Sequence, residues 1–417
     1  MTGIRRQHKR VLIYSHDSFG LGHLRRCRTI AHSLVDADRD LSVLILSGSP
    51  IIGSFDFRAR VDFVRIPGVI KLRNGEYTSL SLHMRIEETL GLRASIIRHT
   101  ADIFDPDLLI VDKEPLGLRG EVRGTLEMLR RRGVPAVLGL RDVLDEPAQL
   151  APEWARKNVL PALQRYYDDI WIYGLPQICN PLDGIGLPPS VQKRIAYTGY
   201  LRRTVPSALL GGAVPGGIED GEPFLLVTPG GGGDGEALVD WVLAAYEADT
   251  ALPHRALVVL GPFMQPERRA EFQARAARLG DGRRVHAIIF DAHLETLMAR
   301  ASGVVAMGGY NTFCEILSFD KPALLVPRTA PRREQYIRAS RAAELGLVSM
   351  LEDDGERDPL RMAAALRQLP QQPVPSRTVV PGLLDGLQSV NRLARKWLDQ
   401  GVPRPKAVAG IGRSPQS

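Results

Sequence analysis

The chain has 417 residues, of which 44% are hydrophobic, so it is long enough to bury the cores of two domains. Its net charge of +7 suits a phosphorylated substrate or an anionic membrane surface, whereas dispersed arginines and an aromatic content of only 6% argue against nucleic acid. The basic start lacks a signal-type apolar core, and no apolar run reaches the roughly eighteen residues of a membrane span, so we expect a cytoplasmic protein.

The first half of the chain alternates short apolar runs with helical patterns, which is typical of a parallel α/β sheet. Strands are predicted at residues 10–15, 42–46, 61–66, 108–111, 136–140, 169–173 and 195–198. A helical period runs over residues 80–103 and stops before Pro106. Open α/β sheets bind ligands at the carboxyl ends of their strands, so we expect charged side chains there to face a cleft. These side chains are Asp112, Lys113, Glu114, Arg141 and Asp142.

The first predicted strand leads through a loop with two glycines, Gly20 and Gly22, into a helix that begins near His23. The third glycine of the dinucleotide-binding fingerprint would fall at Arg25. We therefore expect neither NAD nor any other cofactor.

The second half repeats this plan after a segment that lacks apolar periodicity. Its strands are predicted at residues 224–227, 257–260, 285–290, 301–307 and 323–326. The chain thus divides into a first domain (1–200), a linker (201–222), a second domain (223–380), a helix (381–400) and a disordered tail (401–417).

The segment around residue 310 predicts a strand, a tight glycine turn and an exposed helix start. Gly308 and Gly309 let an anion approach the backbone, and Asn311 and Thr312 are good residues for starting a helix. The unpaired N–H groups of such a helix start suit a phosphate. Glu315 lies one turn further along the same helix face, where its carboxylate can accept two hydrogen bonds from a ribose diol.

A basic loop then brings Glu334 and Gln335, which can bind sugar hydroxyls, to the start of another helix. The ordered pattern resembles the donor-binding segment of GT-B glycosyltransferases, most closely the MurG-like proteins of glycosyltransferase family 28. The matching positions are Gly309, Asn311, Thr312, Glu315, Pro322, Pro327 and Gln335. The alternative is that this segment is an ordinary strand-helix-strand unit without a ligand, in which Glu315 is simply solvated.

The resemblance implies two Rossmann-like parallel-sheet domains with an interdomain cleft and a last helix that packs back on the first domain. It implies a UDP-sugar donor, with UDP-N-acetylglucosamine as the first candidate. In this reading Glu315 holds the ribose, Gln335 holds the donor sugar, and the reaction is glycosyl transfer to an unknown acceptor.

Other residues extend the expected donor site. Gly230, Gly231 and Gly232 have no side chains to obstruct phosphate binding, although such a run is also a common flexible turn. Phe290 ends the strand predicted at 285–290 and joins the donor set. The segment from Thr198 resembles an interdomain stretch of the family in which an arginine approaches the diphosphate. Either Arg202 or Arg203 could take that part, or both could be solvated.

The loop with Gly20 and Gly22 resembles the acceptor-side loop of MurG-like proteins, in which a histidine lies at the cleft. His23 is therefore the candidate catalytic base, and its ordinary pKa near neutrality suits the role. Asp17 and Glu114 are the alternative candidates for the catalytic base.

The sequence has two DxD pairs, Asp36/Asp38 and Asp105/Asp107. They lie at a helix end and before a strand rather than at the cleft end of a strand, so no metal site is expected. Transfer should then be metal-independent, and with His23 as a single base on the face opposite the leaving group it should be inverting. Two departures from the family leave both the acceptor and the donor sugar open. Arg141 and Asp142 replace its polar acceptor-side motif, and Gln335 has no second glutamine beside it.

Two other functions remain open. The run from Gly20 to Cys27 also resembles the UDP-sugar hydrolases of nonulosonate biosynthesis, in which a histidine directs water at the sugar. A non-catalytic nucleotide-sugar-binding protein is the third reading. The expected partners are a UDP-sugar and an acceptor that is either free or membrane-associated, with peripheral contact at the inner face of the membrane in the latter case.

Overall fold

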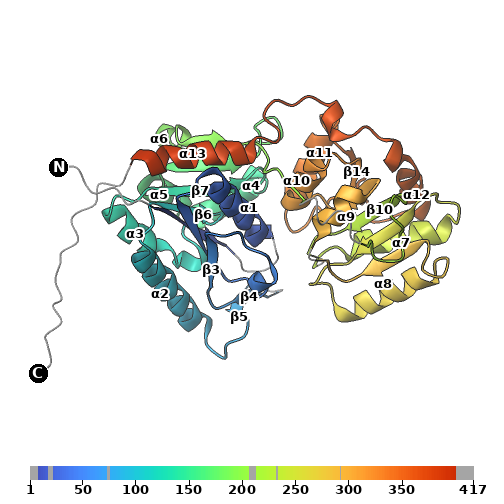
Figure 1. The fold of residues 1–417 in the computed structure, drawn as a ribbon, viewed down its shortest axis with the longest axis horizontal. Helices are drawn as coiled ribbons and strands as arrows, with labels where there is room; N and C mark the ends of the chain where they lie inside the picture. The colour runs from blue at the N-terminus through green and yellow to red at the C-terminus, as the bar shows by residue number, and fades with distance from the viewer. Residues whose placement is uncertain are drawn as a thin grey trace, which may run out of the picture.

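Two β-sheets with flanking helices form the two halves of the protein (Figure 1). The computed structural model describes residues 8–16, 22–72, 76–205, 213–231, 233–291 and 293–400. The predictions for Asp17, Gly20, Gly232 and the tail from residue 401 fall outside these ranges.

Seven parallel strands make the first sheet, in the order β3-β2-β1-β6-β7-β8-β9. They are β1 (Lys9–Ser15), β2 (Leu41–Ser47), β3 (Val61–Arg65), β6 (Leu108–Asp112), β7 (Ala136–Arg141), β8 (Asp169–Tyr173) and β9 (Ile195–Tyr197). Successive side chains of a strand point to opposite faces, so Val11 and Ile13 join one core and Leu12 and Tyr14 another. Burial on both faces explains why these strands are continuous apolar runs.

Helices and short turns connect these strands. They are α1 (Gly22–Ala37), η1 (Ile52–Ser54), α2 (Ile86–Phe104), η2 (Leu118–Gly120), α3 (Arg123–Arg131), α4 (Pro147–Arg156), α5 (Val159–Tyr166) and α6 (Pro189–Gln192). The helix predicted from residue 80 was placed too early. It begins at Ile86, because the carboxylate of Glu88 accepts a hydrogen bond from the backbone N–H of Arg85 and caps the helix there. An unpredicted antiparallel hairpin, β4 (Val69–Lys71) and β5 (Tyr77–Ser79), precedes it.

The second sheet has six parallel strands in the order β12-β11-β10-β13-β14-β15. They are β10 (Phe224–Thr228), β11 (Arg255–Val259), β12 (Val285–Ile288), β13 (Gly303–Ala306), β14 (Ala323–Leu325) and β15 (Ser349–Met350). The connecting helices are α7 (Glu236–Ala248), α8 (Pro266–Arg278), α9 (Leu294–Arg300), α10 (Tyr310–Ser318), α11 (Glu334–Glu344), α12 (Pro359–Gln368), η4 (Leu369–Gln371) and η5 (Pro375–Arg377). The predicted strands are thus confirmed within two residues at each end.

Both sheets reverse their strand order at one point, between β1 and β6 in the first and between β10 and β13 in the second. Loops that leave the carboxyl ends of the two strands at such a point diverge to opposite faces and leave a crevice. The crevice of the first sheet therefore lies between the start of α1 and the end of β6. The crevice of the second lies between the loop after β10 and the turn before α10.

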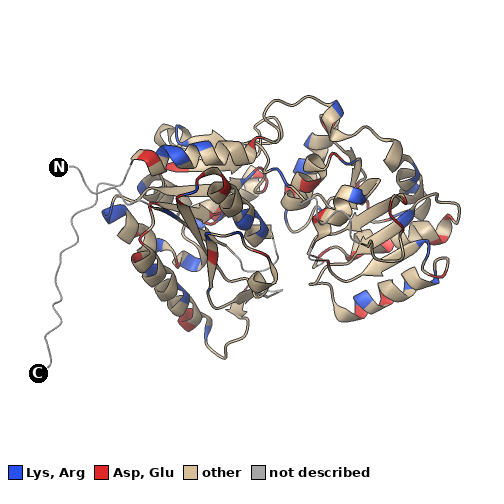
Figure 2. Ribbon diagram, in the orientation of Figure 1, with Lys and Arg blue, Asp and Glu red and all other residues tan. Residues whose placement is uncertain are grey.

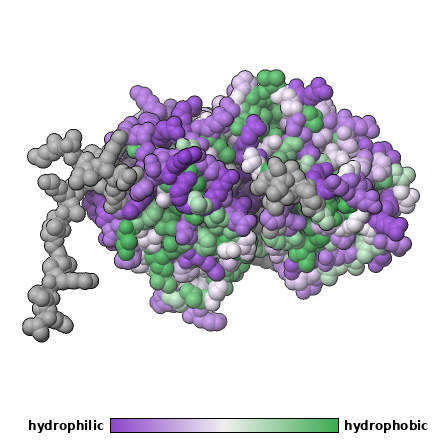
Figure 3. All heavy atoms as spheres, viewed as in Figure 1, coloured by the Kyte–Doolittle hydropathy of each residue, from purple (hydrophilic) through white to green (hydrophobic). Residues whose placement is uncertain are grey.

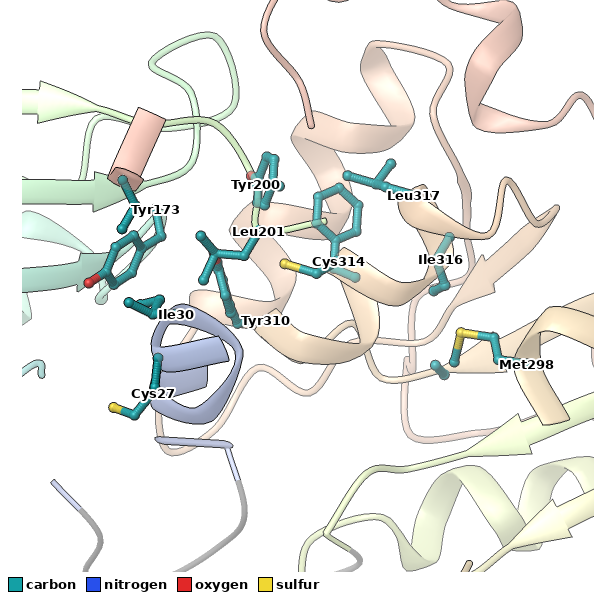
Figure 4. Packing of buried hydrophobic residues seen from close by; sticks show 14 of the residues in the cluster. Cys27, Ile30, Tyr173, Tyr200, Leu201, Met298, Tyr310, Cys314, Ile316 and Leu317 are labelled. Atoms are coloured by element: carbon teal, nitrogen blue, oxygen red, sulfur yellow. The ribbon is translucent and has the colours of Figure 1, made fainter. Parts of the chain in front are cut away.

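An apolar seam joins the two domains. Figure 4 shows Cys27 and Ile30 of α1 on one side, Tyr310 and Cys314 of α10 on the other, and Leu201 of the connecting segment between them. All five belong to one buried cluster. The domains therefore share part of their core.

The last helix, α13 (Gly386–Gln400), lies along the first domain beside α1 (Figure 1). The indole N–H of Trp397 donates a hydrogen bond to Asp169 at 2.7 Å. The returning chain meets the outgoing one where the backbone N–H of Tyr200 donates to the carbonyl of Leu383 at 2.8 Å. Gly199, with a φ of +85°, packs so closely there that a Cβ atom would lie 2.3 Å from the carbonyl oxygen of Gly382.

Lysine and arginine are interspersed with acidic residues over both domains (Figure 2). In the part of the chain that is described, no helix is long and apolar enough to cross a membrane.

A fully buried ion pair connects the two domains. Arg338 of α11 donates to both carboxylate oxygens of Asp142, at 2.6 and 2.7 Å, and both side chains have no solvent exposure. The hydroxyl of Tyr200 donates to the same carboxylate at 2.7 Å. Buried charges require such complete pairing because neither water nor mobile ions can reach them.

We predict that Asp142→Ala lowers the free energy of unfolding by about 3 to 5 kcal/mol, because it leaves the Arg338 charge buried without its carboxylate. Urea denaturation followed by circular dichroism measures this. Arg341→Ala on the same helix is the control, since Arg341 pairs with Glu344 at the surface and should cost under about 0.5 kcal/mol. Equal unfolding midpoints for the two variants would contradict the prediction.

Candidate active site

A cavity of about 450 Å³ lies between the two domains, and both contribute residues to its wall. Several side chains that the sequence singled out line it, together with glycines from both domains. They are Gly22, His23, Gly230, Gly231, Phe290, Gly309, Asn311, Thr312 and Gln335. The structure brings these positions together at the crevices of the two sheets.

His23 is held by a carboxylate of the neighbouring crevice strand. Its Nδ1 lies 2.5 Å from Oδ2 of Asp112, the last residue of β6. Arg26, one helical turn after His23, donates to both oxygens of Asp112 at 2.6 to 2.8 Å. A carboxylate so close to Nδ1 requires a proton on that nitrogen, so Nδ1–H donates to Asp112 and Nε2 keeps its lone pair. Nε2 has no hydrogen-bond partner among the described residues.

The surroundings keep His23 uncharged and Asp112 ionised. Burial lowers the pKa of His23 to about 4, and Arg26 and Lys113 act in the same direction against Asp112. Burial alone would raise the pKa of Asp112, but the charges and hydrogen bonds of Arg26 and His23 together outweigh it and hold that pKa well below its usual range. At neutral pH the arrangement is therefore a neutral imidazole oriented by a carboxylate, which is suited to accept a proton.

The alternative base Glu114 does not line the cavity. Its carboxylate pairs with Lys157 at 3.0 Å. Burial would raise the pKa of the Glu114 carboxylate, but the cations Lys113 and Lys157 act against burial, and the pKa is lowered to about 2. Such a weakly basic carboxylate has little tendency to accept a proton near neutrality.

The turn before α10 has the geometry of an anion site. Gly308 has a φ of +77°, which a side chain would strain, and a Cβ atom on Gly309 would meet nothing within 4 Å. Gly309 is the N-cap, so α10 begins at Tyr310, one residue before the predicted start. Across the crevice Gly230 also has a positive φ, +89°, and open space around it. Two sets of backbone groups without obstructing side chains thus meet at the cavity.

Asn311 connects the domains. Its amide donates to the carbonyl of Gly22 at 2.9 Å, and its oxygen accepts a hydrogen bond from Arg203 at 2.8 Å. Arg203 is buried and also donates to Thr29, whereas Arg202 is exposed. Neither arginine lines the cavity.

Glu315 lies behind the cavity wall rather than in it. Its side chain is fully buried, and Oε1 accepts a hydrogen bond from Arg25 of α1 at 2.6 Å, while Oε2 has no partner. Arg25 also donates to Glu295 at 2.6 Å, and both Arg25 and Glu295 line the cavity. Burial raises the pKa of Glu315 to about 7, whereas Arg25 overcomes burial and lowers the pKa of Glu295 to about 2. One guanidinium is thus shared between two carboxylates.

Gln335 and Glu334 stand at the start of α11. The side-chain oxygen of Gln335 accepts a hydrogen bond from the backbone N–H of Arg328 at 3.2 Å. The guanidinium of Arg328 donates to Glu334 at 2.7 Å and forms an ion pair with Asp234 of the opposite loop at 2.6 Å. Arg328 therefore fixes this wall of the cavity.

Several residues at this site were not assigned a role from sequence. Asp112 was expected at the cleft, but its pairing with His23 depends on β1 and β6 being neighbours in the sheet. Arg26 and Arg25 come from the helix that was predicted, and nothing in their spacing reveals their partners. Glu295 lies at the start of α9, for which no functional pattern was recognised. Within the described ranges, no group of three or more His, Cys, Asp and Glu side chains could hold a metal ion.

Comparison with known proteins identifies the second domain. Residues 230–375 match the family described as the glycosyltransferase family 28 C-terminal domain, which confirms the resemblance noted in the sequence. No curated protein sequence matches the chain.

Solved structures share the two-domain fold. MurG of Acinetobacter baumannii is 13% identical, with a TM-score of 0.56 over 93% of this chain and 99% of that one. CalG4, the calicheamicin glycosyltransferase, is 16% identical, with a TM-score of 0.58 over 95% of this chain and 100% of that one. The UDP-GlcNAc 2-epimerase of Neisseria meningitidis, solved with UDP-GlcNAc, is 15% identical, with a TM-score of 0.62 over 94% and 100%. The expected GT-B fold is thereby confirmed.

We predict that His23 titrates well below an ordinary histidine. Because its pKa is lowered from 6.5 to about 4, the imidazole should stay neutral as the pH falls from 8 to about 5 and take up a proton only near 4. Histidine Cε1–H shifts in an NMR titration measure this, with the His23 signal assigned by its loss in His23→Gln. A midpoint at or above 6.5 would show that burial does not control this group.

Proposed function

We propose that this chain, a glycosyltransferase with a family 28 C-terminal domain in a GT-B fold, moves a sugar from a UDP-sugar to an acceptor hydroxyl with inversion and without a metal ion. UDP-N-acetylglucosamine is the first donor candidate. The observation that carries the proposal is the neutral His23, oriented by Asp112, across a common cavity from the glycine turn at the start of α10.

The proposed reaction uses His23 on one side of the cavity and the glycine turn before α10 on the other. Nε2 of His23 accepts the proton of the acceptor hydroxyl while its oxygen attacks the anomeric carbon of the donor. The bond from that carbon to the β-phosphate oxygen breaks, and its electron pair leaves with UDP. One base on the face opposite the leaving group is sufficient, so the new glycoside has the inverted anomeric configuration.

Backbone groups at two glycine turns stabilise the leaving UDP in this proposal. Negative charge develops on the β-phosphate as the bond breaks, and preorganised N–H groups at a helix start lower the energy of that charge. The turn at Gly309 and the loop at Gly230 and Gly231 supply such groups, with Arg203 close behind Asn311. This arrangement supports phosphate stabilisation by the protein alone.

Glu315 binds the ribose in this proposal, which requires Arg25 to release it. The unpartnered Oε2 supports the assignment, because a buried carboxylate oxygen without a hydrogen bond is costly and a ribose hydroxyl would satisfy it. Arg25 keeps Glu295 as a second partner when it moves. Glu315 would thus exchange its ion pair with Arg25 for hydrogen bonds to the ribose, while Arg25 would keep its ion pair with Glu295.

A membrane-associated acceptor is supported by apolar side chains at the surface of the first domain. They lie in and after the β4–β5 hairpin, at Leu72, Leu80, Leu82, Met84 and Leu92. Figure 3 shows hydrophobic patches on the lower part of this domain, where Figure 1 places β4, β5 and α2. Clustered exposed apolar residues are a feature of surfaces that contact membranes or other proteins.

We predict that His23→Ala lowers kcat by about 10² to 10⁴-fold, the usual contribution of a general base, with little change in donor affinity. A thermal-shift screen of nucleotide sugars first identifies the donor, and UDP release with candidate acceptors then measures turnover. His99→Ala is the control, because His99 is exposed on α2, outside the cavity.

The same assay separates the three candidate functions. A hydrolase releases free sugar without an acceptor, a transferase requires one, and a binding protein yields neither product. Full kcat in His23→Ala, activity abolished by EDTA, or a product with the donor's anomeric configuration would each contradict the proposed mechanism.

We predict that Glu315→Ala weakens UDP binding by about 1.5 to 3 kcal/mol, the range for lost hydrogen bonds to a charged group. The matched ligand is a UDP analogue lacking both ribose hydroxyls, whose binding the substitution should leave nearly unchanged. Isothermal titration calorimetry of both ligands gives the coupling between the carboxylate and the diol. Glu356→Ala, at an exposed position, is the control. Equal losses for the two ligands would mean that Glu315 acts through Arg25 and not on the ribose.

A further inference from the structure

Arg141 is the arginine of the cavity wall that has no ion-pair partner among the described residues. Five arginines line the wall, and Arg25, Arg26, Arg328 and Arg338 each form an ion pair with a carboxylate. Arg141, the last residue of β7, forms no ion pair or hydrogen bond from its guanidinium to any described residue. A cation-lined cavity therefore has one guanidinium left to bind something else.

Part of the Arg141 guanidinium is shielded from solvent. The Nε atom of Arg141 is inaccessible to solvent and has no hydrogen-bond partner. The pKa of Arg141 is lowered to about 10, chiefly by burial; the nearby charge of Glu334 opposes this effect, and Arg26 and Arg338 act in the same direction as burial. Arg141 as a whole is half-buried, and an unpaired charge whose Nε is cut off from solvent is costly unless a ligand pairs with it. Such groups are therefore concentrated at functional sites.

A second cation increases the positive potential. Lys113, just after β6, has a φ of +66°, a left-handed conformation that costs energy in a residue with a side chain. The pKa of Lys113 is lowered to about 8, chiefly by burial; Glu114 opposes this effect, whereas Arg141 and Arg332 act in the same direction as burial. The adjacent Glu114 is already paired with Lys157. Arg141 at the end of β7 and Lys113 just after the neighbouring β6 thus have no ion-pair partner among the described residues, although Lys113 does not itself line the cavity.

The cavity wall opposite Arg141 indicates whether the donor or the acceptor would carry the anion that binds there. Glu334 and Gln335 of α11 belong to the second domain, where the donor sugar is proposed to lie. Arg141 belongs to the first domain, which carries His23 and therefore the acceptor.

We propose that Arg141 binds an anionic group, a carboxylate or a phosphate, on the acceptor. This inference rests on the proposed function, since it names the class of acceptor for that reaction. The planar guanidinium can donate two parallel hydrogen bonds to either anion, which fixes orientation as well as charge. The positive potential of Lys113 adds to the attraction.

The test uses the full chain, which is first saturated with UDP. Inorganic phosphate is then the probe whose binding is measured. We expect saturable phosphate binding by calorimetry, weakened about 10-fold or more by Arg141→Gln and partly retained by Arg141→Lys, which keeps the charge but not the fork. Affinity for UDP should change less than about 2-fold in both variants. Arg131→Gln, at an exposed position on α3, is the matched control and should bind phosphate normally.

Two comparisons exclude other sources of the anion. If Arg141→Gln weakens UDP itself as much as phosphate, Arg141 is a diphosphate contact and the inference fails. If UDP-glucuronate binds more tightly than UDP-glucose and Arg141→Gln removes the difference, the anion belongs to the donor and the inference fails again. Unchanged phosphate binding in Arg141→Gln also overturns it.

A stability measurement separates ligand binding from a structural role. Because the charge is unpaired when no anion is bound, Arg141→Gln should melt at the same temperature as the parent chain or higher, and phosphate should stabilise only the parent. A lower melting temperature would overturn the inference. These readouts do not depend on turnover, so the anion site can stand even if the chain proves not to transfer a sugar.

Discussion

The buried pair of Asp142 and Arg338 is the constraint on which the cavity depends. Arg338 also donates to the carbonyl of Gly308 at 2.9 Å, which holds the glycine turn, and Tyr200 ties the same carboxylate to the chain crossing. Tyr310 lies between Arg338 and Arg26, with both guanidinium groups within 6 Å of its ring. One network thus fixes the end of β7, the domain connection and the start of α10. The two halves of the site cannot shift independently without exposing or unpairing these charges.

The two walls contribute different chemistry. The first domain supplies titratable side chains, with His23 kept neutral by burial and oriented by Asp112. The second supplies backbone N–H groups at glycine turns, where no side chain restricts the approach of an anion. In the proposed mechanism, a reacting centre between the two walls has a proton acceptor on one side and a stabilised leaving group on the other. Arg25 spans both walls, so in the proposed mechanism the binding of the donor ribose to Glu315 and the contact between the domains are physically linked.

The sequence was informative where local pattern determines structure. Buried parallel strands are continuous apolar runs, and glycine turns need their residue type, so both could be predicted. The pairing of His23 with Asp112 could not, because it depends on which strands are neighbours. The burial of Glu315 behind Arg25 could not either, since residues 290 positions apart meet only through packing of the domains. The β4–β5 hairpin was missed because its strands have only three residues each.

The course of α13 bears on how the protein is synthesised. Val390, Ala394 and Leu398 of this helix are buried in the core cluster that also contains α1. The first domain is therefore built from both the earliest and the late parts of the chain. A ribosome releases the second domain before this helix, so the apolar surface beside α1 stays uncovered until then. We expect the nascent first domain to need a chaperone, or temporary non-native burial of that surface, during translation.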